Sequence, residues 1–329
     1  MLTLHKEQNK VVCEIVNKKK RTPVYWHPRI NPALMNAVDD IQHFNDGFLR
    51  DNTELGKKQA NLIFEDLEKE ETPEENQHKF FKVKRVVQER LLTEMELDDG
   101  SNEIFQIDFP QNQEFCGHEL VTGSTQSGKT YFVKEKILRN LKGPERFRRH
   151  FLIISSEWHR DNTLSELKEK KYENYVTGVD VSESSLKDSE HTTAEEFFEN
   201  EIKLRVENVP KGTVLFFDDS QDSCCPDQLR QLINRMLRVA RHSGVSLIVI
   251  LHSIRSGAWS SQANNSVKYY TLFPRAQKNK IIAFVNQDLA VPLKEARETI
   301  RRFAQSGRSM TVHLHAPECL VGPKLLKLL

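Results

Sequence analysis

One eight-residue segment has the residue types and spacing of a phosphate-binding loop. It reads G-x4-G-K-T and consists of Gly123, Ser124, Thr125, Gln126, Ser127, Gly128, Lys129 and Thr130. Glycines and small side chains let backbone N–H groups curl around phosphate oxygens, and a helix that starts there adds the partial positive charge of its N-terminus. Lys129 is expected to reach the β- and γ-phosphates of ATP, and Thr130 to ligate Mg²⁺ through its hydroxyl. The alternative is a chance glycine-rich turn. It is disfavoured because an apolar strand, 119–122, precedes the segment and a helix, 131–141, follows it.

A second candidate group follows an apolar stretch at 214–217. Asp218 and Asp219 come directly after it. Asp218 suits a Mg²⁺ ligand, usually acting through water, and Asp219 is placed to polarise the attacking water. Alone, two aspartates after a strand are more often a solvated turn. Their position about 90 residues after a sound phosphate loop leaves room for the intervening β/α units and favours the functional interpretation.

The most apolar run of the chain, 245–251, ends in His252 and Ser253. A polar side chain at the tip of a strand beside the acidic one can sense the γ-phosphate. The alternative is that His252 only caps the strand.

The order of apolar runs predicts an α/β fold. Runs that end in polar loops lie at 119–122, 151–155, 214–217, 247–251, 269–273 and 310–314, with helical stretches between most of them. Continuous apolar strands separated by helices indicate a mostly parallel sheet with helices on both faces. We therefore expect a P-loop NTPase domain over 111–329, with a helix over 226–242.

Residues 1–110 have a different character and are expected to form a smaller, largely helical accessory or adaptor region. Two helices are predicted, near 52–70 and 77–97, after a proline-containing loop at 21–32. The basic cluster 18–21 is read as a solvated turn, with a nuclear-import signal as the alternative.

The composition suits a soluble, intracellular globular protein. Charged residues make up 29% of the 329 residues and hydrophobic ones 38%, and the net charge is +1. No global field therefore attracts nucleic acid, and a DNA contact must come from a local basic patch. The arginines of 226–242 do not share one helical face, so a solvated face is the preferred interpretation there. The five cysteines lack metal-site spacing, and no signal peptide or apolar run long enough to span a bilayer is present.

Several segments, taken in order, resemble the genome-packaging ATPases of the FtsK–HerA superfamily. The resemblance covers about residues 113–320, and the branch it suggests is the poxvirus-like one shared with virophages and Maverick/Polinton elements. The segments are ELVTGSTQSGKTYFVKEKIL, FLIISSEWH, TVLFFDDSQD, LRVARHSGVSLIVILHS, NNSVKYYTLFPRAQ and SGRSMTVHLHAP. This chain departs from the pattern near 272–275, which is shorter, and residues 1–110 match no named family.

The resemblance implies that ATP hydrolysis with Mg²⁺ drives double-stranded DNA, without sequence preference, into a preformed capsid. It also implies a homo-oligomeric ring that works with capsid proteins, in the host cytoplasm or nucleus at sites of virion assembly. In such rings an arginine from the neighbouring subunit neutralises charge on the γ-phosphate. Arg275 is the first candidate, with Arg241 and Arg255 as alternatives, and each could instead be a surface residue.

Three other functions stay open at this point. A soluble HerA- or FtsK-like cellular or plasmid DNA translocase would carry the same motifs. A small-molecule or nucleotide kinase would need an arginine-rich lid, which the sequence does not show. An inactive P-loop scaffold is disfavoured by the intact Lys129, Thr130, Asp218 and Asp219. No second carboxylate cluster with nuclease spacing is found, so no DNA cleavage is expected.

Overall fold

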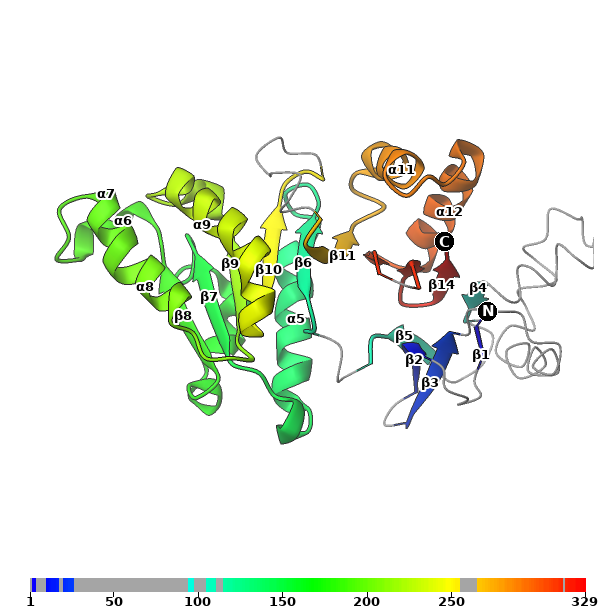
Figure 1. Cartoon of the computed structure of the whole chain (residues 1–329), viewed down its shortest axis with the longest axis horizontal. Helices are drawn as coiled ribbons and strands as arrows, with labels where there is room; N and C mark the ends of the chain where they lie inside the picture. The colour runs from blue at the N-terminus through cyan, green and yellow to red at the C-terminus, as the bar shows by residue number, and fades with distance from the viewer. Residues whose placement is uncertain are drawn as a thin grey trace, which may run out of the picture. The chain divides into compact units, whose positions relative to one another are not determined.

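The computed structural model describes two compact units (Figure 1). The larger unit consists of 111–304 and 311–315, and the smaller one of 1–110, 305–310 and 316–329. The described residues are 2–3, 10–17, 20–26, 94–97, 105–110, 115–254, 265–315 and 317–329.

The larger unit is built on a parallel sheet whose strand order brings the predicted site residues to one edge. Six strands follow one another in the order β11-β6-β10-β9-β7-β8, and β12 lies next to β11. The strands are β6 (His118–Thr122), β7 (Phe151–Ser155), β8 (Val176–Asp180), β9 (Val214–Asp218), β10 (Ser246–Leu251), β11 (Val267–Leu272) and β12 (Met310–His313). The five pairings from β11 to β8 are parallel. Strand β10 therefore lies between β6, which leads into the phosphate loop, and β9, which leads into Asp218.

Helices connect these strands. They are α5 (Lys129–Lys142), η2 (Glu145–Phe147), η3 (Asn162–Lys168), η4 (Lys170–Tyr172), α6 (Glu183–Asp188), α7 (Ala194–Phe197), η5 (Phe198–Lys203), α8 (Leu204–Glu207), η6 (Ser220–Asp222), α9 (Pro226–Val239), η7 (Ala240–Ser243), α11 (Lys278–Gln287) and α12 (Leu293–Ser306). The helix predicted over 226–242 is thus an α-helix to Val239 that continues as a tighter 3₁₀ turn.

Both faces of the sheet are buried, because strand residues of both parities are inaccessible to solvent. Val121, Ile153 and Phe216 share a core cluster with the apolar side of α5. The alternate residues of the same strands point to the opposite face and are also buried, among them Leu120, Leu152, Leu215 and Phe217. The buried side of α9 does not belong to the α5 cluster. The prediction of a mostly parallel P-loop α/β fold with helices is confirmed.

The smaller unit is made of antiparallel strands from both ends of the chain. Strands β1 (Leu2–Thr3), β2 (Lys10–Asn17), β3 (Lys20–Trp26) and β5 (Phe105–Asp108) form a sheet of order β1-β3-β2-β5. Strands β13 (Cys319–Val321), β14 (Leu325–Leu328) and β4 (Glu94–Glu96) pair antiparallel in that order. Buried residues from both groups form one core, including Cys13, Ile15, Met95, Cys319 and Leu326.

The expectation of a largely helical N-terminal region is wrong for the residues that the structure describes there. Glu94–Glu96, inside the helix predicted over 77–97, is strand β4. Lys20–Trp26, expected as a turn and loop, is strand β3. Pro23 lies opposite Glu14 of β2, and β1 pairs only with Tyr25 and Trp26 at the far end of β3. On that side, therefore, no described strand needs a hydrogen bond from position 23, which makes proline tolerable there. The helix predicted at 52–70 and residues 77–93 of the second lie outside the described residues.

Three further features bear on the predictions made from the sequence. Arg21, from the basic cluster, forms ion pairs with Glu14 and, at 3.4 Å, with Asp108. All five cysteines are free thiols. Among the described residues, no helix is both long enough and apolar enough to cross a bilayer.

Candidate functional site

The phosphate loop joins the end of β6 to the start of α5, as the motif requires. Gly128 has the left-handed φ of 95° that allows the chain to turn into the helix at Lys129. At Gly123 an added Cβ would lie 2.5 Å from Ser127 Oγ and 3.1 Å from the Phe273 ring. Glycine is therefore required at both ends of the loop, at one for its backbone conformation and at the other for close approach.

The Lys129 side chain bends back onto the phosphate loop. Its Nζ donates to the carbonyl oxygens of Gly123, at 2.9 Å, and Ser124, at 3.0 Å. Burial lowers the pKa of Lys129, while the nearby Asp219 and Asp218 act in the opposite direction. Ser127 Oγ is buried and has no hydrogen-bond partner within the described part of the chain. A buried hydroxyl without a partner and a lysine held only by carbonyls are suited to meet phosphate oxygens.

Thr130 and Asp218 meet across the gap between α5 and β9, as predicted for the two metal ligands. Thr130 Oγ1 donates to Asp218 Oδ1 at 3.3 Å. Asp218 is 2% exposed. Burial, with added repulsion from Asp219, raises the pKa of Asp218 to about 8. A buried carboxylate beside a hydroxyl is a hard-oxygen donor pair of the kind that Mg²⁺ takes, and a bound cation would stabilise the ionised carboxylate. These two residues therefore fit a Mg²⁺ site, where the ion would neutralise phosphate charge.

Asp219 is more open than its neighbour and has a fixed backbone. Its φ of 46° is left-handed, an uncommon conformation for a residue other than glycine. Ser156 Oγ, just after β7, donates to the Asp219 carbonyl at 3.1 Å. The carboxylate is 34% exposed and lies 3.6 Å from His252 Nε2. Asp219 can therefore contact solvent water next to the buried metal ligand, as its predicted role requires.

His252 lies directly after β10, and its Nε2 is close to the Asp219 carboxylate. Since β10 lies between β6 and β9, its carboxyl end is between the phosphate loop and the acidic pair. The structure thus brings Lys129, Thr130, Asp218, Asp219 and His252 to one edge of the sheet.

Gln277, which sequence reasoning missed, holds the backbone at this tip. Its Nε2 donates to the His252 carbonyl at 2.8 Å, and its buried Oε1 has no partner among the described residues. Gln277 directly precedes α11, and a glutamine after a strand gives no distinctive pattern in the sequence. It links the start of α11 to the predicted sensor strand.

Arg275 does not join this cluster within the described chain. Its Nε donates to the Ala304 carbonyl at 2.7 Å, and its side chain is exposed. Phe273, two residues earlier, packs close to Gly123, so Arg275 leaves the sheet next to the phosphate loop. Of the alternatives, the side chain of Arg241 and the whole of Arg255 lie outside the described residues.

Comparisons with known proteins find similar solved structures only. No protein-family model matches the sequence, and a search of curated proteins finds no match. The genome-packaging NTPase B204 of Sulfolobus turreted icosahedral virus 2, in complex with ATP-γ-S, is 16% identical. The alignment covers 63% of this chain and 97% of B204, with a TM-score of 0.38.

Two other similar structures belong to transfer and secretion systems. The pCW3 conjugation coupling protein TcpA is 14% identical, with 68% of this chain and 63% of TcpA covered and a TM-score of 0.37. The cytoplasmic domain of the Thermomonospora curvata type VII secretion ATPase EccC is 12% identical, with 70% and 28% covered and a TM-score of 0.39. The fold assignment rests on the sheet order and the phosphate loop of this chain itself.

Proposed function

We propose that this protein is an ATPase that uses hydrolysis to translocate double-stranded DNA. The observation that carries the enzymatic part is the convergence of Lys129, the Thr130–Asp218 pair and the Asp219–His252 pair at one edge of the sheet. Lys129 and the loop N–H groups would hold the phosphates of ATP, and Thr130 with Asp218 would hold Mg²⁺. Asp219 would orient the attacking water, and His252 would respond to the γ-phosphate.

The substrate that hydrolysis serves is inferred from the sequence resemblance to packaging ATPases. We propose that the DNA is a viral genome driven into a preformed capsid by a homo-oligomeric ring, with capsid proteins as partners. A soluble HerA- or FtsK-like cellular or plasmid translocase is the second candidate and would use the same site. A capsid-protein gene beside this one would favour packaging over the second candidate.

The test is ATP hydrolysis by the purified chain with and without duplex DNA. We expect Mg²⁺-dependent hydrolysis that DNA of unrelated sequences stimulates equally, and none of it in Lys129→Ala. Hydrolysis that DNA leaves unchanged, but that a small-molecule acceptor accelerates, would instead indicate a kinase.

A further inference from the structure

A group of basic side chains lies at the opposite end of the sheet from the phosphate loop. The connection from α5 to β7, residues 143–150, contains three arginines and a single carboxylate, Glu145. Lys211 lies just before β9 and packs close to Gly244, which lies just before β10. Arg149 lies close to Gly212. Because the strands are parallel, all these residues belong to the amino-terminal edge of the sheet.

The backbone and the aromatic side chains of this segment hold the arginines in place. Asn140 of α5 is buried; its Nδ2 donates to the Phe147 carbonyl and its Oδ1 accepts from the Arg149 N–H, each at 2.9 Å. Arg148 Nε donates to the Gly143 carbonyl at 3.2 Å, and its guanidinium lies 5.8 Å from the Tyr175 ring centroid. The Arg146 guanidinium lies 4.7 Å from the Phe147 ring centroid. Ordered guanidinium groups lose less entropy when they bind an anion.

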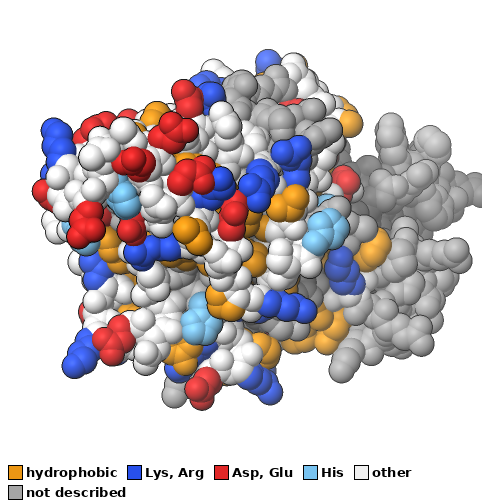
Figure 2. Space-filling view, turned by 60° about the vertical axis from the view of Figure 1, so that its left-hand side comes forward, with side chains coloured by type: hydrophobic (Ala, Val, Ile, Leu, Met, Phe, Trp, Pro, Cys, Tyr) orange, Lys and Arg blue, Asp and Glu red, His pale blue; other side chains and the backbone are white. Residues whose placement is uncertain are grey.

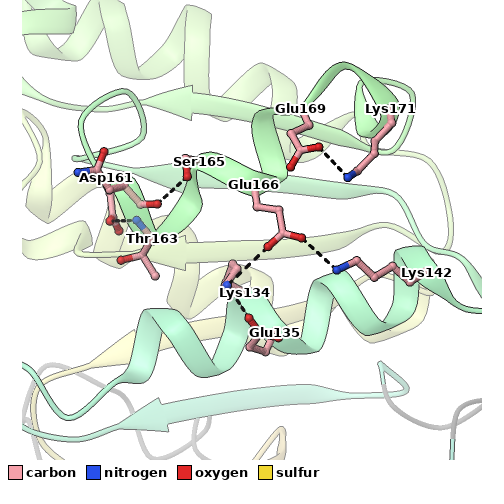
Figure 3. Close-up of polar contacts among 10 residues, drawn as sticks. Lys134, Glu135, Lys142, Asp161, Thr163, Ser165, Glu166, Glu169 and Lys171 are labelled. Atoms are coloured by element: carbon pink, nitrogen blue, oxygen red, sulfur yellow. Dashed lines mark hydrogen bonds and ion pairs between the residues drawn. The ribbon is translucent and has the colours of Figure 1, made fainter.

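These arginines differ from the other basic residues around them, because no carboxylate pairs with them in the part of the chain that the structure describes. Nearby lysines are neutralised: Figure 3 shows Lys142 and Lys134 turned toward Glu166, and Lys171 toward Glu169. The face that carries α6 to α8 also mixes acidic with basic side chains (Figure 2), as in the pairs Lys203–Glu199 and Arg205–Glu201.

Two of the arginines of α9 are paired with carboxylates. Arg230 pairs with Asp227 and Arg235 with Glu207, each at 2.9 Å. Arg238 Nε donates to the Asn234 carbonyl at 3.3 Å. These pairs agree with the interpretation of α9 as a solvated face. Segment 143–150, in contrast, carries three arginines that have no carboxylate partner among the described residues.

We propose that Arg146, Arg148, Arg149 and Lys211, here called the basic edge, bind the phosphate backbone of duplex DNA. The inference rests on the proposed function and locates its DNA contact. Clustered cations repel one another, and a row of phosphates relieves that repulsion while releasing counterions. Guanidinium groups match phosphate geometry and read no base sequence from the backbone. Since the basic edge and the phosphate loop lie at opposite ends of the strands, ATP and DNA can be bound together.

The experiment measures the affinity of the full chain for a labelled duplex over a series of salt concentrations. The test variant carries Arg146→Gln, Arg148→Gln and Arg149→Gln together. Each lost phosphate contact lowers the slope of log K against log salt by about one, so we expect a slope smaller by about three than in the unaltered chain. The matched control, Arg230→Gln with Arg235→Gln, should keep the full slope because those charges are already paired.

A second variant separates electrostatics from folding. The triple change to lysine keeps the charge and should retain most of the slope, and thermal unfolding and ATP affinity should match the unaltered chain for every variant. If the triple glutamine variant binds DNA with the unaltered slope and affinity, the basic edge is not the contact, although the proposed function stands. If the unaltered chain fails to bind duplex DNA even at low salt, the proposed function fails and this inference fails with it.

Discussion

Asp218 and Asp219 are adjacent in sequence, yet the fold gives them different environments. Asp218 is enclosed beside Thr130, and its pKa is raised to about 8 by burial and by Asp219. Asp219 has a left-handed backbone conformation, is partly exposed, and its carboxylate lies near His252 Nε2. We propose that these two environments divide two tasks between chemically identical side chains: the buried Asp218 would bind the metal, and the partly exposed Asp219 would orient the water.

This division predicts different defects for two substitutions. Lys129→Ala removes the positive charge from the phosphate loop, so both ATP affinity and turnover should be lost. Asp219→Asn keeps the metal pair but removes the carboxylate, so ATP should bind normally while turnover falls by about a hundredfold or more. Nucleotide affinity and single-turnover rates measure the two effects separately. Wild-type turnover in Asp219→Asn would show that another group orients the water.

For single residues, the order of the strands along the chain was enough to predict which side chains lie near the phosphate loop. The positions of Asp218 and His252 were predictable because each lies at the carboxyl end of a strand, and carboxyl ends of parallel strands meet at one edge. The position of Thr130 was predictable from the phosphate-loop motif that follows β6. The contact of Lys129 with its own loop was not, since it depends on the loop conformation. The role of Gln277 was also hidden, because its partner is a backbone carbonyl 25 residues earlier.

At the scale of elements, a buried polar network fixes α5 against the sheet. Lys136 of α5 pairs with Glu119 of β6 at 2.6 Å, and Glu119 also accepts from Thr271 of β11 at 2.6 Å. Thr271 in turn lies 2.7 Å from the Thr311 hydroxyl of β12. The helix that starts at the phosphate loop is thereby tied to three strands, and its position relative to Asp218 depends on those ties.

Removing the lysine should therefore be costly. Lys136→Met leaves Glu119 buried without its counter-charge, and the free energy of unfolding should fall by about 3–5 kcal/mol. Lys142→Met, on the same helix, removes a solvent-exposed pair with Glu166 and should leave the free energy of unfolding nearly unchanged. Urea unfolding of both variants gives the comparison. Equal stabilities would show that the buried pair is not what holds α5.

The hydrogen bond from Gln277, just before α11, to the carbonyl of His252, just after β10, predicts that its loss lowers kcat without changing ATP affinity. Gln277→Ala removes the hydrogen bond to the His252 carbonyl, worth about 1 kcal/mol, so kcat should fall about fivefold while ATP affinity is unchanged. Lys280→Ala, which alters only an exposed 3.5 Å contact with Ser253, is the control. A Gln277 variant with unaltered kcat, or one that lost ATP affinity instead, would contradict the positioning role.

How well each strand could be predicted depended on its hydrophobic pattern. The apolar run 151–155 matches β7 residue for residue, because every one of its side chains is buried. Strand β8 was missed because it is an edge strand in which Val179 alone is fully buried. Strand β3 begins with Lys20 and Arg21 and contains Pro23, a composition that favours a turn and loop over a strand. Strand β2 pairs with β5, far away in the sequence, which no local pattern predicts.

At the scale of the whole molecule, both ends of the chain belong to the smaller unit, not to the unit that carries the phosphate loop. Strand β14 pairs with β4, more than two hundred residues away in sequence. No local pattern announces such a pairing, so the grouping of 316–329 with the N-terminal residues was not predictable. The larger unit, by contrast, is built from consecutive β/α units and was predictable from their order.

A ring mechanism makes a prediction about mixed subunits. Arg275 is exposed beside the phosphate loop and meets no phosphate-site residue in the described chain, so we propose that it serves a neighbouring subunit. Arg275→Ala and Lys129→Ala should each be inactive, and mixing them should restore part of the ATPase activity, because some interfaces then combine an intact loop with an intact arginine. Rings that form but stay inactive at every mixing ratio would exclude Arg275.

Translocation along DNA can be measured directly as displacement of a third strand from duplex DNA. A motor that moves along the duplex strips a triplex-forming oligonucleotide in its path. We predict displacement that requires ATP and Mg²⁺, occurs equally on unrelated flanking sequences, and is absent in Lys129→Ala. DNA-stimulated ATP hydrolysis without displacement of the third strand, at any protein concentration that saturates the duplex, would show that the protein does not move along DNA.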